Sequence, residues 1–287
     1  MKTLPSPRLR VAKEIAHEVF RNTNAVIGLI ILGLIIVMAI FADQITPYDP
    51  IVSYPEEALQ PPSLSHLMGT DDLGRDIFSR VIHGARVSLY VAFISTVLAI
   101  CIGAPLGMLG GYFGGVIDII ISRITDMLFA IPDVLLALTV IAILGAGMNQ
   151  LTLALAVAYT PIFMRLTRGV ALKSRDLPYV EAARAIGERE HDIILNYILP
   201  NCIPPLIVQA TLTFAYAVLA EAAFSFLALG VKPPTPSWGR MLSDARVFMV
   251  TAPWAALFPG IAIFITSMAF NLIGDGLRDA FDVRLRT

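Results

Sequence analysis

Long apolar runs separated by short polar connections dominate this chain. A membrane-spanning helix needs about 20 apolar residues, because each residue rises 1.5 Å and the hydrocarbon core is roughly 30 Å thick. We expect spans at 25–42, 87–109, 116–144, 151–168, 203–230 and 255–273. The third and fifth runs exceed one membrane thickness, so they tilt, kink or extend into water. The pattern therefore predicts an all-α, polytopic membrane protein with six transmembrane helices.

Composition supports this prediction and excludes several functions. Hydrophobic residues make up 56% of the 287 residues and charged residues only 15%, against roughly 25% in soluble domains. A net charge of −1 gives no reason to expect nucleic acid as a partner. The sequence lacks a phosphate-binding loop and the HExxH and GxSxG motifs, and its four His residues are scattered. We therefore expect no enzymatic activity, cofactor or metal site in this chain.

The distribution of Lys and Arg predicts the orientation. Most of the 21 lie on one side of the membrane if the N-terminus is cytoplasmic, as the positive-inside rule expects. Both termini and the connection between the fourth and fifth spans are then cytoplasmic. The predicted segments are a cytoplasmic N-terminus (1–24), a first, uncleaved span (25–42), an extracytoplasmic segment (43–85), a core of five spans (86–275) and a cytoplasmic tail (276–287).

The polar insert at 174–200, which we call the elbow, interrupts the apolar core. Asp176 precedes Pro178 as a candidate N-cap, and Glu181 lies in the first turn, where the helix dipole favours an acid. Gly187 disfavours helix and suggests a turn or a tight contact. Small residues, Ala182 and Ala183, would allow another surface to approach, and Leu199-Pro200 would stop a second short helix at 190–198. We favour a docking site over the alternative of a plain solvated loop.

A family resemblance rests on this insert. The residues Glu181-Ala-Ala, Gly187, Leu199 and Pro200 resemble the "EAA" loop of permease subunits of bacterial ATP-binding-cassette importers, with Tyr197 where the family usually has Ile. Three further motifs resemble the second permease of dipeptide, oligopeptide and nickel importers. They are Gly69-Thr-Asp-Asp-Leu-Gly-Arg-Asp76, Pro234-Thr-Pro-Ser-Trp-Gly239 and Phe270-Asn-Leu-Ile-Gly-Asp-Gly-Leu-Arg-Asp279.

The resemblance implies a type I importer permease fold in the bacterial inner membrane. It implies four kinds of partner: a second, non-identical permease, two ATPase subunits that bind ATP and Mg, an extracytoplasmic substrate-binding protein, and membrane lipid. The implied coupling residues are Glu181, Ala182, Ala183, Gly187, Leu199 and Pro200. The implied substrate is a short peptide, with nickel, glutathione, opines or sugars as alternatives.

The other motifs also predict local structure. Asp72 is a candidate cap for a short helix that starts near Ile77 and enters the second span; a calcium site fits the acid spacing less well. Small residues at every fourth position, Gly103, Gly107, Gly111 and Gly115, predict close packing against the third span or a partner subunit. In the last motif, Gly274 and Gly276 are expected to end the final helix.

Polar residues within the spans are candidates for the translocation pathway, because charge at bilayer depth is costly. We nominate Asp133, Gln209 and Glu221. For Glu221 the alternatives are an interhelical hydrogen bond or a position nearer the outer interface. Asp126 is expected either in the pathway or paired with Arg123. A secondary transporter driven by an ion gradient through Glu221 and Asp133 is the competing function, but it predicts inverted repeats that the sequence does not show.

Overall fold

The computed structural model describes residues 18–284, which form helices and loops with one isolated β-bridge between Thr70 and Asp76. The long helices are α2 (Thr23–Ile40), α4 (Ile77–Phe113), α5 (Gly115–Phe129), α6 (Asp133–Leu144), α7 (Met148–Ser174), α10 (Leu199–Phe226) and α12 (Trp254–Arg284). The short ones are α3 (Ala42–Ile45), α8 (Pro178–Ala185), α9 (Glu190–Ile193) and α11 (Trp238–Ala245), with single turns at Pro55–Glu57, Ile194–Ile198 and Arg246–Phe248.

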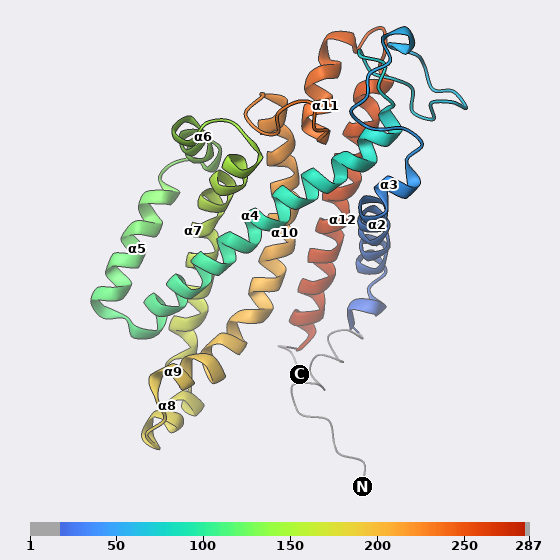
Figure 1. The fold of residues 1–287 in the computed structure, drawn as a ribbon. Helices are drawn as coiled ribbons and strands as arrows, with labels where there is room; N and C mark the ends of the chain where they lie inside the picture. Colours follow the sequence, from blue (N-terminus) through green and yellow to red (C-terminus); the bar gives the residue numbers. More distant parts are fainter. Residues whose placement is uncertain (1–17, 285–287) are drawn as a thin grey trace.

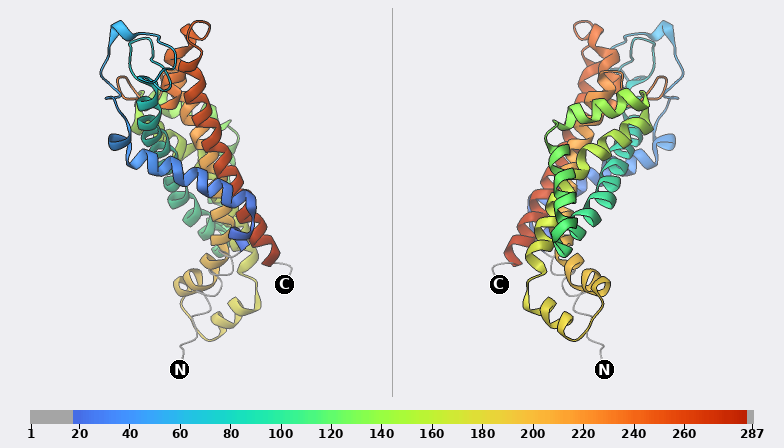
Figure 2. Two further views of the ribbon diagram at one scale, coloured as in Figure 1. Left: turned by 90° about the vertical axis from the view of Figure 1, so that its right-hand side faces the viewer. Right: turned by 90° about the vertical axis from the view of Figure 1, so that its left-hand side faces the viewer.

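The helices form an elongated bundle with two distinct ends (Figure 1). At one end, α8 and α9 project beyond the bundle; we call this the elbow end. At the other, α11 and residues 46–76 gather over the helix tips, and we call this the loop end (Figures 1 and 2). The start of α2 and the end of α12 meet at the elbow end, where Asn22 Nδ2 donates to Asp279 Oδ2 at 3.1 Å. The described ends of the chain thus lie on the side of the elbow.

All six predicted spans are helical, but they differ in character. By length and apolarity, four single helices among residues 18–284 qualify as membrane spans, and α5 with α6 make a fifth if the bent pair is one span. The remaining predicted span, the fourth in chain order, lies in α7, which is long enough to cross a membrane but more polar than the others. Its packing explains why it can be more polar. It lies along α4 and against α10, so that much of its surface is covered by protein rather than lipid.

Two prolines within the predicted spans, Pro132 and Pro161, act differently. Pro132 is the N-cap of α6, and α5 and α6 meet there at 90°, so the third run is broken as expected. Pro161, in contrast, lies inside an uninterrupted α7. The prediction that Leu199-Pro200 stops a helix is also wrong. Here α9 continues through a π-helical turn into α10, and Pro200 is tolerated because it falls in the first turn of α10.

Glycines set the closest helix approaches. A Cβ on Gly103, Gly107 or Gly111 would lie 2.1–2.5 Å from backbone oxygens of α7, so α4 packs directly on the α7 backbone. The partner is therefore the fourth predicted span, neither the third nor another subunit. Gly274 and Gly276 do not end α12, which continues to Arg284. They let it approach Thr211 of α10 and Ala25 of α2.

The loop end contains two features that the sequence pattern did not predict correctly. The N-cap of α4 is Asp76, whose carboxylate accepts from Ser79 N at 2.8 Å, and not Asp72. Helix α11, which we did not predict, follows the Pro-rich stretch 232–236, with Ser237 as its N-cap. Trp238 then donates from Nε1 to Val81 O at 2.9 Å, which fixes α11 against α4.

Candidate functional site

The elbow begins where α7 ends at Ser174. Helix α8 starts with Pro178 in its first turn, and its N-cap is Leu177, which provides no side-chain hydrogen bond. Asp176, the expected cap, instead pairs with Arg175, whose Nε lies 3.3 Å from Asp176 Oδ1. Proline therefore starts this helix without a capping side chain, since its fixed φ suits the first turn.

Gly187 ends α8 in the way that the sequence suggested. Its φ is +84°, and the Glu188 amide donates to Ala183 O while the Gly187 amide donates to Arg184 O, both at 3.1 Å. This is a Schellman motif with glycine at the left-handed position. Among residues 18–284, no atom beyond its chain neighbours lies within 4 Å of the place a Cβ would occupy, so the glycine serves the turn and makes no tight contact there.

The two faces of α8 have opposite surroundings. Val180 and Ala183 are buried against the bundle, whereas Glu181 and Ala182 are exposed. Ile186, which we did not single out from the sequence, is 83% exposed beside the turn. An isolated large apolar residue in a polar insert was the available signal for it. The exposed surface of α8, which we call the ridge, thus consists of an acid (Glu181), a small residue (Ala182) and a large apolar residue (Ile186).

A three-residue junction joins the elbow to α4. Tyr112, near the end of α4, donates its hydroxyl proton to Glu190 and accepts from Arg184 Nη2 at 3.3 Å. Arg184 Nε also lies 3.6 Å from Glu190 Oε1. The hydrogen bond to Tyr112 raises the pKa of Arg184, so this guanidinium stays charged. Because these residues belong to α4, α8 and α9, they tie both short helices of the elbow to α4.

Further contacts lie within the elbow and between the helices beside it. Tyr197 donates its hydroxyl to Glu188 at 3.1 Å, and Asn201 Nδ2 donates to the Tyr179 hydroxyl at 2.8 Å. Leu199 is half-buried against the main core, and Pro200 is exposed. Nearby, Arg168 of α7 forms two hydrogen bonds with Asp118 of α5, at 2.5 and 2.7 Å. The elbow is therefore held by contacts within itself and to α4 and α10.

The three candidate pathway residues occupy different environments, and no hydrogen bond or ion pair joins any two of them within residues 18–284. Asp133 is exposed at the start of α6, where it accepts from Val134 N at 2.8 Å. Gln209 is half-buried in α10 and donates to Thr213 Oγ1 at 3.4 Å.

Glu221 is completely buried. Its carboxylate accepts from Ser88 Oγ of α4 and from Ser225 Oγ of its own helix, both at 2.7 Å. The Trp238 amide, at the start of α11, donates to the same Ser88 oxygen at 3.4 Å. These contacts favour the interhelical hydrogen bond over an open pathway for Glu221. Asp126 pairs with Arg165 of α7 at 3.4 Å rather than with Arg123.

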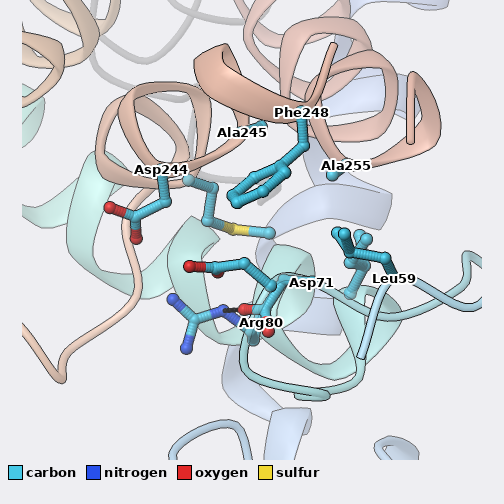
Figure 3. A pocket seen from close by; sticks show the side chains of 10 residues that line it. Leu59, Asp71, Arg80, Asp244, Ala245, Phe248 and Ala255 are labelled. Carbon is cyan, nitrogen blue, oxygen red and sulfur yellow. Dashed lines mark ion pairs between the residues drawn. The ribbon is translucent and has the colours of Figure 1, made fainter. Parts of the chain in front are cut away.

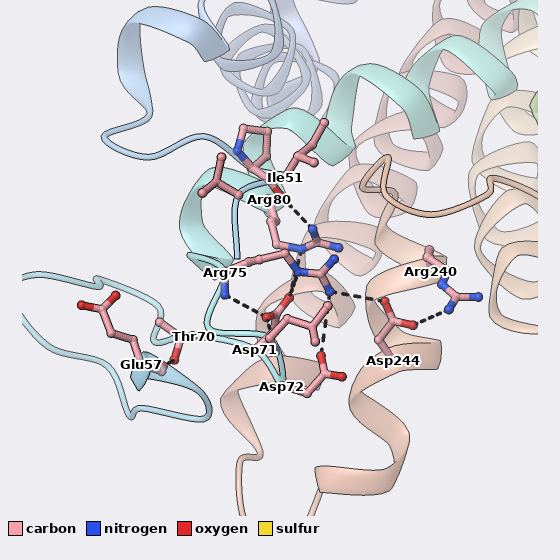
Figure 4. A network of polar contacts seen from close by, with 12 residues as sticks. Ile51, Glu57, Thr70, Asp71, Asp72, Arg75, Arg80, Arg240 and Asp244 are labelled. Carbon is pink, nitrogen blue, oxygen red and sulfur yellow. Dashed lines mark hydrogen bonds and ion pairs between the residues drawn. The ribbon is translucent and has the colours of Figure 1, made fainter. Parts of the chain in front are cut away.

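The loop end has its own polar network, drawn in Figure 4. Asp71 binds Arg75 Nε at 2.8 Å and lies 3.3 Å from Arg80 Nε, while Arg80 Nη1 donates to Pro50 O at 2.8 Å. Asp244 of α11 lies 3.9 Å from Arg75 and 2.8 Å from Arg240. The motif from Gly69 to Asp76 therefore ties residues 50–76 to α4 and α11.

Beside this network is a small pocket (Figure 3). Asp71, Arg80 and Asp244 line its polar side, and its apolar lining includes Leu59, Ala245, Phe248 and Ala255. It has room for about one water molecule. Within residues 18–284 no three His, Cys, Asp or Glu residues are placed to hold a metal ion. Such a pocket is too small for a substrate, and the network is a structural joint.

Comparisons with known proteins agree with one another. Residues 103–287 match the family described as binding-protein-dependent transport system inner membrane component, and residues 12–62 match the N-terminal TM domain of oligopeptide transport permease C. The dipeptide transport system permease protein DppC of Alkalihalophilus pseudofirmus is 45% identical over 96% of this chain and 90% of its own. The glutathione transport system permease protein GsiD of Pectobacterium atrosepticum is 44% identical over 96% and 92%.

A solved structure shows the same fold. The inward-facing methionine ABC transporter MetNI matches with a TM-score of 0.57 and 21% identity, covering 70% of this chain and 96% of that chain. At this identity the match concerns only the fold. It is the fold of an ABC importer permease, as expected for the type I class.

Proposed function

The chain belongs to the family of binding-protein-dependent transport system inner membrane components, and on that basis we propose that it is one permease half of an ATP-driven importer of short peptides. The observation that carries the coupling role is the exposed ridge of α8, which consists of Glu181, Ala182 and Ile186. This ridge lies beyond the bundle and is held to α4 by the contacts of Tyr112. An exposed large apolar residue, Ile186, beside an exposed small residue, Ala182, is suited to contact with another protein.

Four partners complete the proposed machine. A second, non-identical permease would pair with this chain, two ATPase subunits would bind ATP and Mg at the elbow end, and an extracytoplasmic binding protein would deliver substrate at the loop end. This chain would hydrolyse no ATP itself. The elbow end and both chain termini would then be cytoplasmic, in agreement with the excess of Lys and Arg there.

The proposed mechanism is a population shift. ATP closes the ATPase pair and moves the docked elbow, and the junction of Tyr112, Arg184 and Glu190 transmits this movement to α4. The bundle then rocks as a rigid body and opens the pathway outward, and hydrolysis returns it to the inward-facing state. Glu181 orients the elbow on the surface of the ATPase, and Gly187 supplies the turn that exposes Ile186.

Dipeptides are our preferred substrate because several relatives at 42–45% identity are named for dipeptide or di/tripeptide transport. Glutathione is the second candidate, supported by relatives of 44% identity named for it. Both are small and carry free ammonium and carboxylate groups, so the two candidates share their chemistry.

The decisive experiment is purification of the tagged chain in mild detergent after co-expression with its partner subunits. We expect a second permease and an ATP-hydrolysing subunit to co-purify, and Ile186→Asp to abolish recovery of the ATPase. Val247→Asp is a matched control, because Val247 is 73% exposed at the opposite end. Recovery of this chain alone, with uptake driven by a proton or sodium gradient, would contradict the proposal. Ala183→Asp is a poorer probe, since Ala183 is buried.

A further inference from the structure

Helix α5 has three different faces. Ile121 and Thr125 form its buried face against the bundle. With 3.6 residues per turn, a second face is apolar and exposed. It consists of Val116, Ile117, Ile120, Ile124 and Met127. The third face, which we call the polar stripe, carries Ser122, Arg123 and Asp126 together with the exposed Ile119, and its two charged residues are exposed. A helix with separate apolar and charged exposed faces meets two different environments.

An ion pair between Asp126 of the polar stripe and Arg165 connects the stripe to α7. Arg165 Nη2 lies 3.4 Å from Asp126 Oδ1, and the two side chains are 59% and 62% exposed. The Arg165 guanidinium also lies 3.8 Å above the Phe129 ring. A single long contact leaves most hydrogen-bonding positions of both groups free, in contrast to the two short bonds between Arg168 and Asp118.

The pair lies on a helix that belongs, together with α6, to a bent pair long and apolar enough to be one membrane span. Asp126 is eleven residues from the start of α5 and three from its end, which places it up to roughly 16 Å along that helix. The neighbouring exposed residues Ile120, Ile124 and Met127 are apolar, as expected for a helix within the bilayer. Charged side chains at such positions face a bundle interior or a water-filled path, because charge in hydrocarbon is costly. Nothing within residues 18–284 covers the polar stripe, so it faces water or another subunit.

Gly169 adds an independent observation. It lies one helical turn beyond Arg165 on α7 and is exposed, and no atom lies within 4 Å of the place its Cβ would occupy. Glycine is unfavourable in a helix interior, and no packing or turn within the part of the chain that the structure describes requires it here. It leaves open space beside Arg165.

We propose that the polar stripe, with Arg165 and Gly169, lines the translocation pathway and that Asp126 and Arg165 separate to bind a zwitterionic substrate. Arg165 would take the carboxylate, because its planar fork matches two carboxylate oxygens, and Asp126 would take the ammonium group. A loose, solvated ion pair is weak, so exchanging it for two charge-assisted contacts is feasible. This inference rests on the proposed importer function and concerns its substrate chemistry.

The first test is uptake of radiolabelled alanyl-alanine by the assembled importer in proteoliposomes. We expect Asp126→Asn and Arg165→Gln each to reduce uptake at least about tenfold, while subunit assembly and basal ATP hydrolysis are retained. Gly169→Leu should reduce uptake by filling the open space. The matched control is Asp43→Asn, which removes one partner of an exposed ion pair with Arg86 at the other end of the chain; it should transport at the wild-type rate.

The second test measures water access and does not depend on activity. Cys101 and Cys202 are replaced by Ala, and single cysteines are introduced at Ile119 and Ile120, which are 61% and 54% exposed at the same depth. Ile119 precedes Arg123 by four residues and so lies on the polar stripe, whereas Ile120 lies on the apolar face. A membrane-impermeant, charged thiol reagent should modify Ile119→Cys at least about tenfold faster in the complete importer, as a water-filled path requires.

The outcomes separate the two proposals. If the wild-type complex shows no ATP-dependent uptake of any peptide, the importer function itself fails. If the wild-type complex transports, but Asp126→Asn and Arg165→Gln transport equally well and both cysteines react at one rate, only the polar-stripe inference is overturned.

Discussion

The two ends of this bundle use charge in opposite ways. At the loop end, Asp71, Arg75 and Arg80 form a network in which the side chains are only 11%, 6% and 2% exposed. At the elbow end, Arg184 and Glu190 remain 48% and 50% exposed while they bind each other. At the loop end Asp71 is paired with Arg75 and Arg80 within the chain, whereas the elbow leaves its ridge uncovered. The network at the loop end is thus a joint within the chain, and the ridge is where we propose that the ATPase docks.

The energetic consequences differ accordingly. Removing one member of a buried ion pair leaves an uncompensated charge out of water, which costs about 3–5 kcal/mol. An exposed pair contributes about 0–1 kcal/mol. Stability measurements on this chain should therefore be sensitive to the loop end, and measurements of transport should be sensitive to the elbow.

The largest expected effect is at Asp71. Asp71→Ala leaves Arg75 and Arg80 without their shared carboxylate, and we expect a loss of about 3–5 kcal/mol in the free energy of unfolding, measured by titration in mixed detergent micelles. Asp72→Asn is the control. Burial raises the pKa of Asp72, which means that the fold disfavours its charged form at neutral pH, so removing this charge should cost little. Equal losses for the two variants would show that the network does not hold the loop end together.

An intermediate loss of stability is expected when either of two glycines with similar backbone geometry is replaced by alanine. Gly74 and Gly187 have φ values of +73° and +84°, but a Cβ on Gly74 would lie 1.8 Å from Tyr54 O, whereas Gly187 is open. Gly187→Ala should cost about 1–2 kcal/mol of stability, the penalty for a left-handed non-glycine residue. Gly74→Ala should cost more, because the Tyr54 backbone must also move. The same unfolding titration checks this, and a larger loss at Gly187 than at Gly74 would contradict the close backbone contact at Gly74.

The smallest expected effect on stability, with a large effect on transport, is at Tyr112. Tyr112→Phe removes the hydrogen bonds to Glu190 and Arg184 and should cost only about 1 kcal/mol of stability. The elbow would then be less firmly tied to α4, so we expect fewer substrates imported per ATP hydrolysed. Tyr216→Phe is the matched control, because Tyr216 is 63% exposed and lies on α10. An unchanged ratio of transport to hydrolysis would remove Tyr112 from the coupling route.

Much of the fold was predictable from the order of apolar and polar residues. The six helical segments, the break at Pro132 and the turn at Gly187 follow from local rules about hydrophobic length and backbone freedom. The errors share a cause. Asp72 and Asp176 are plausible caps by sequence spacing, yet Asp76 caps α4 and a proline starts α8, because side-chain direction depends on the fold around each turn.

The site residues show the same division. The elbow was recognisable because a polar, Ala- and Gly-containing insert is unusual between membrane spans. Glu221 was conspicuous for its charge, but only the packing of α4, α10 and α11 turned it into a buried hydrogen-bond acceptor. The Asp126–Arg165 pair was missed because its members are 39 residues apart and meet only when α5 lies beside α7.

The sequence by itself determined that this chain is a membrane-embedded helical bundle with an exposed elbow, since hydrophobic length, helix breakers and charge bias act locally and need no partner. The tertiary structure decided which charges are buried, which glycines are contact points and which polar face remains uncovered. These properties depend on distances between segments far apart in the chain, and the free energy of a charge is set by what surrounds it rather than by its neighbours in sequence.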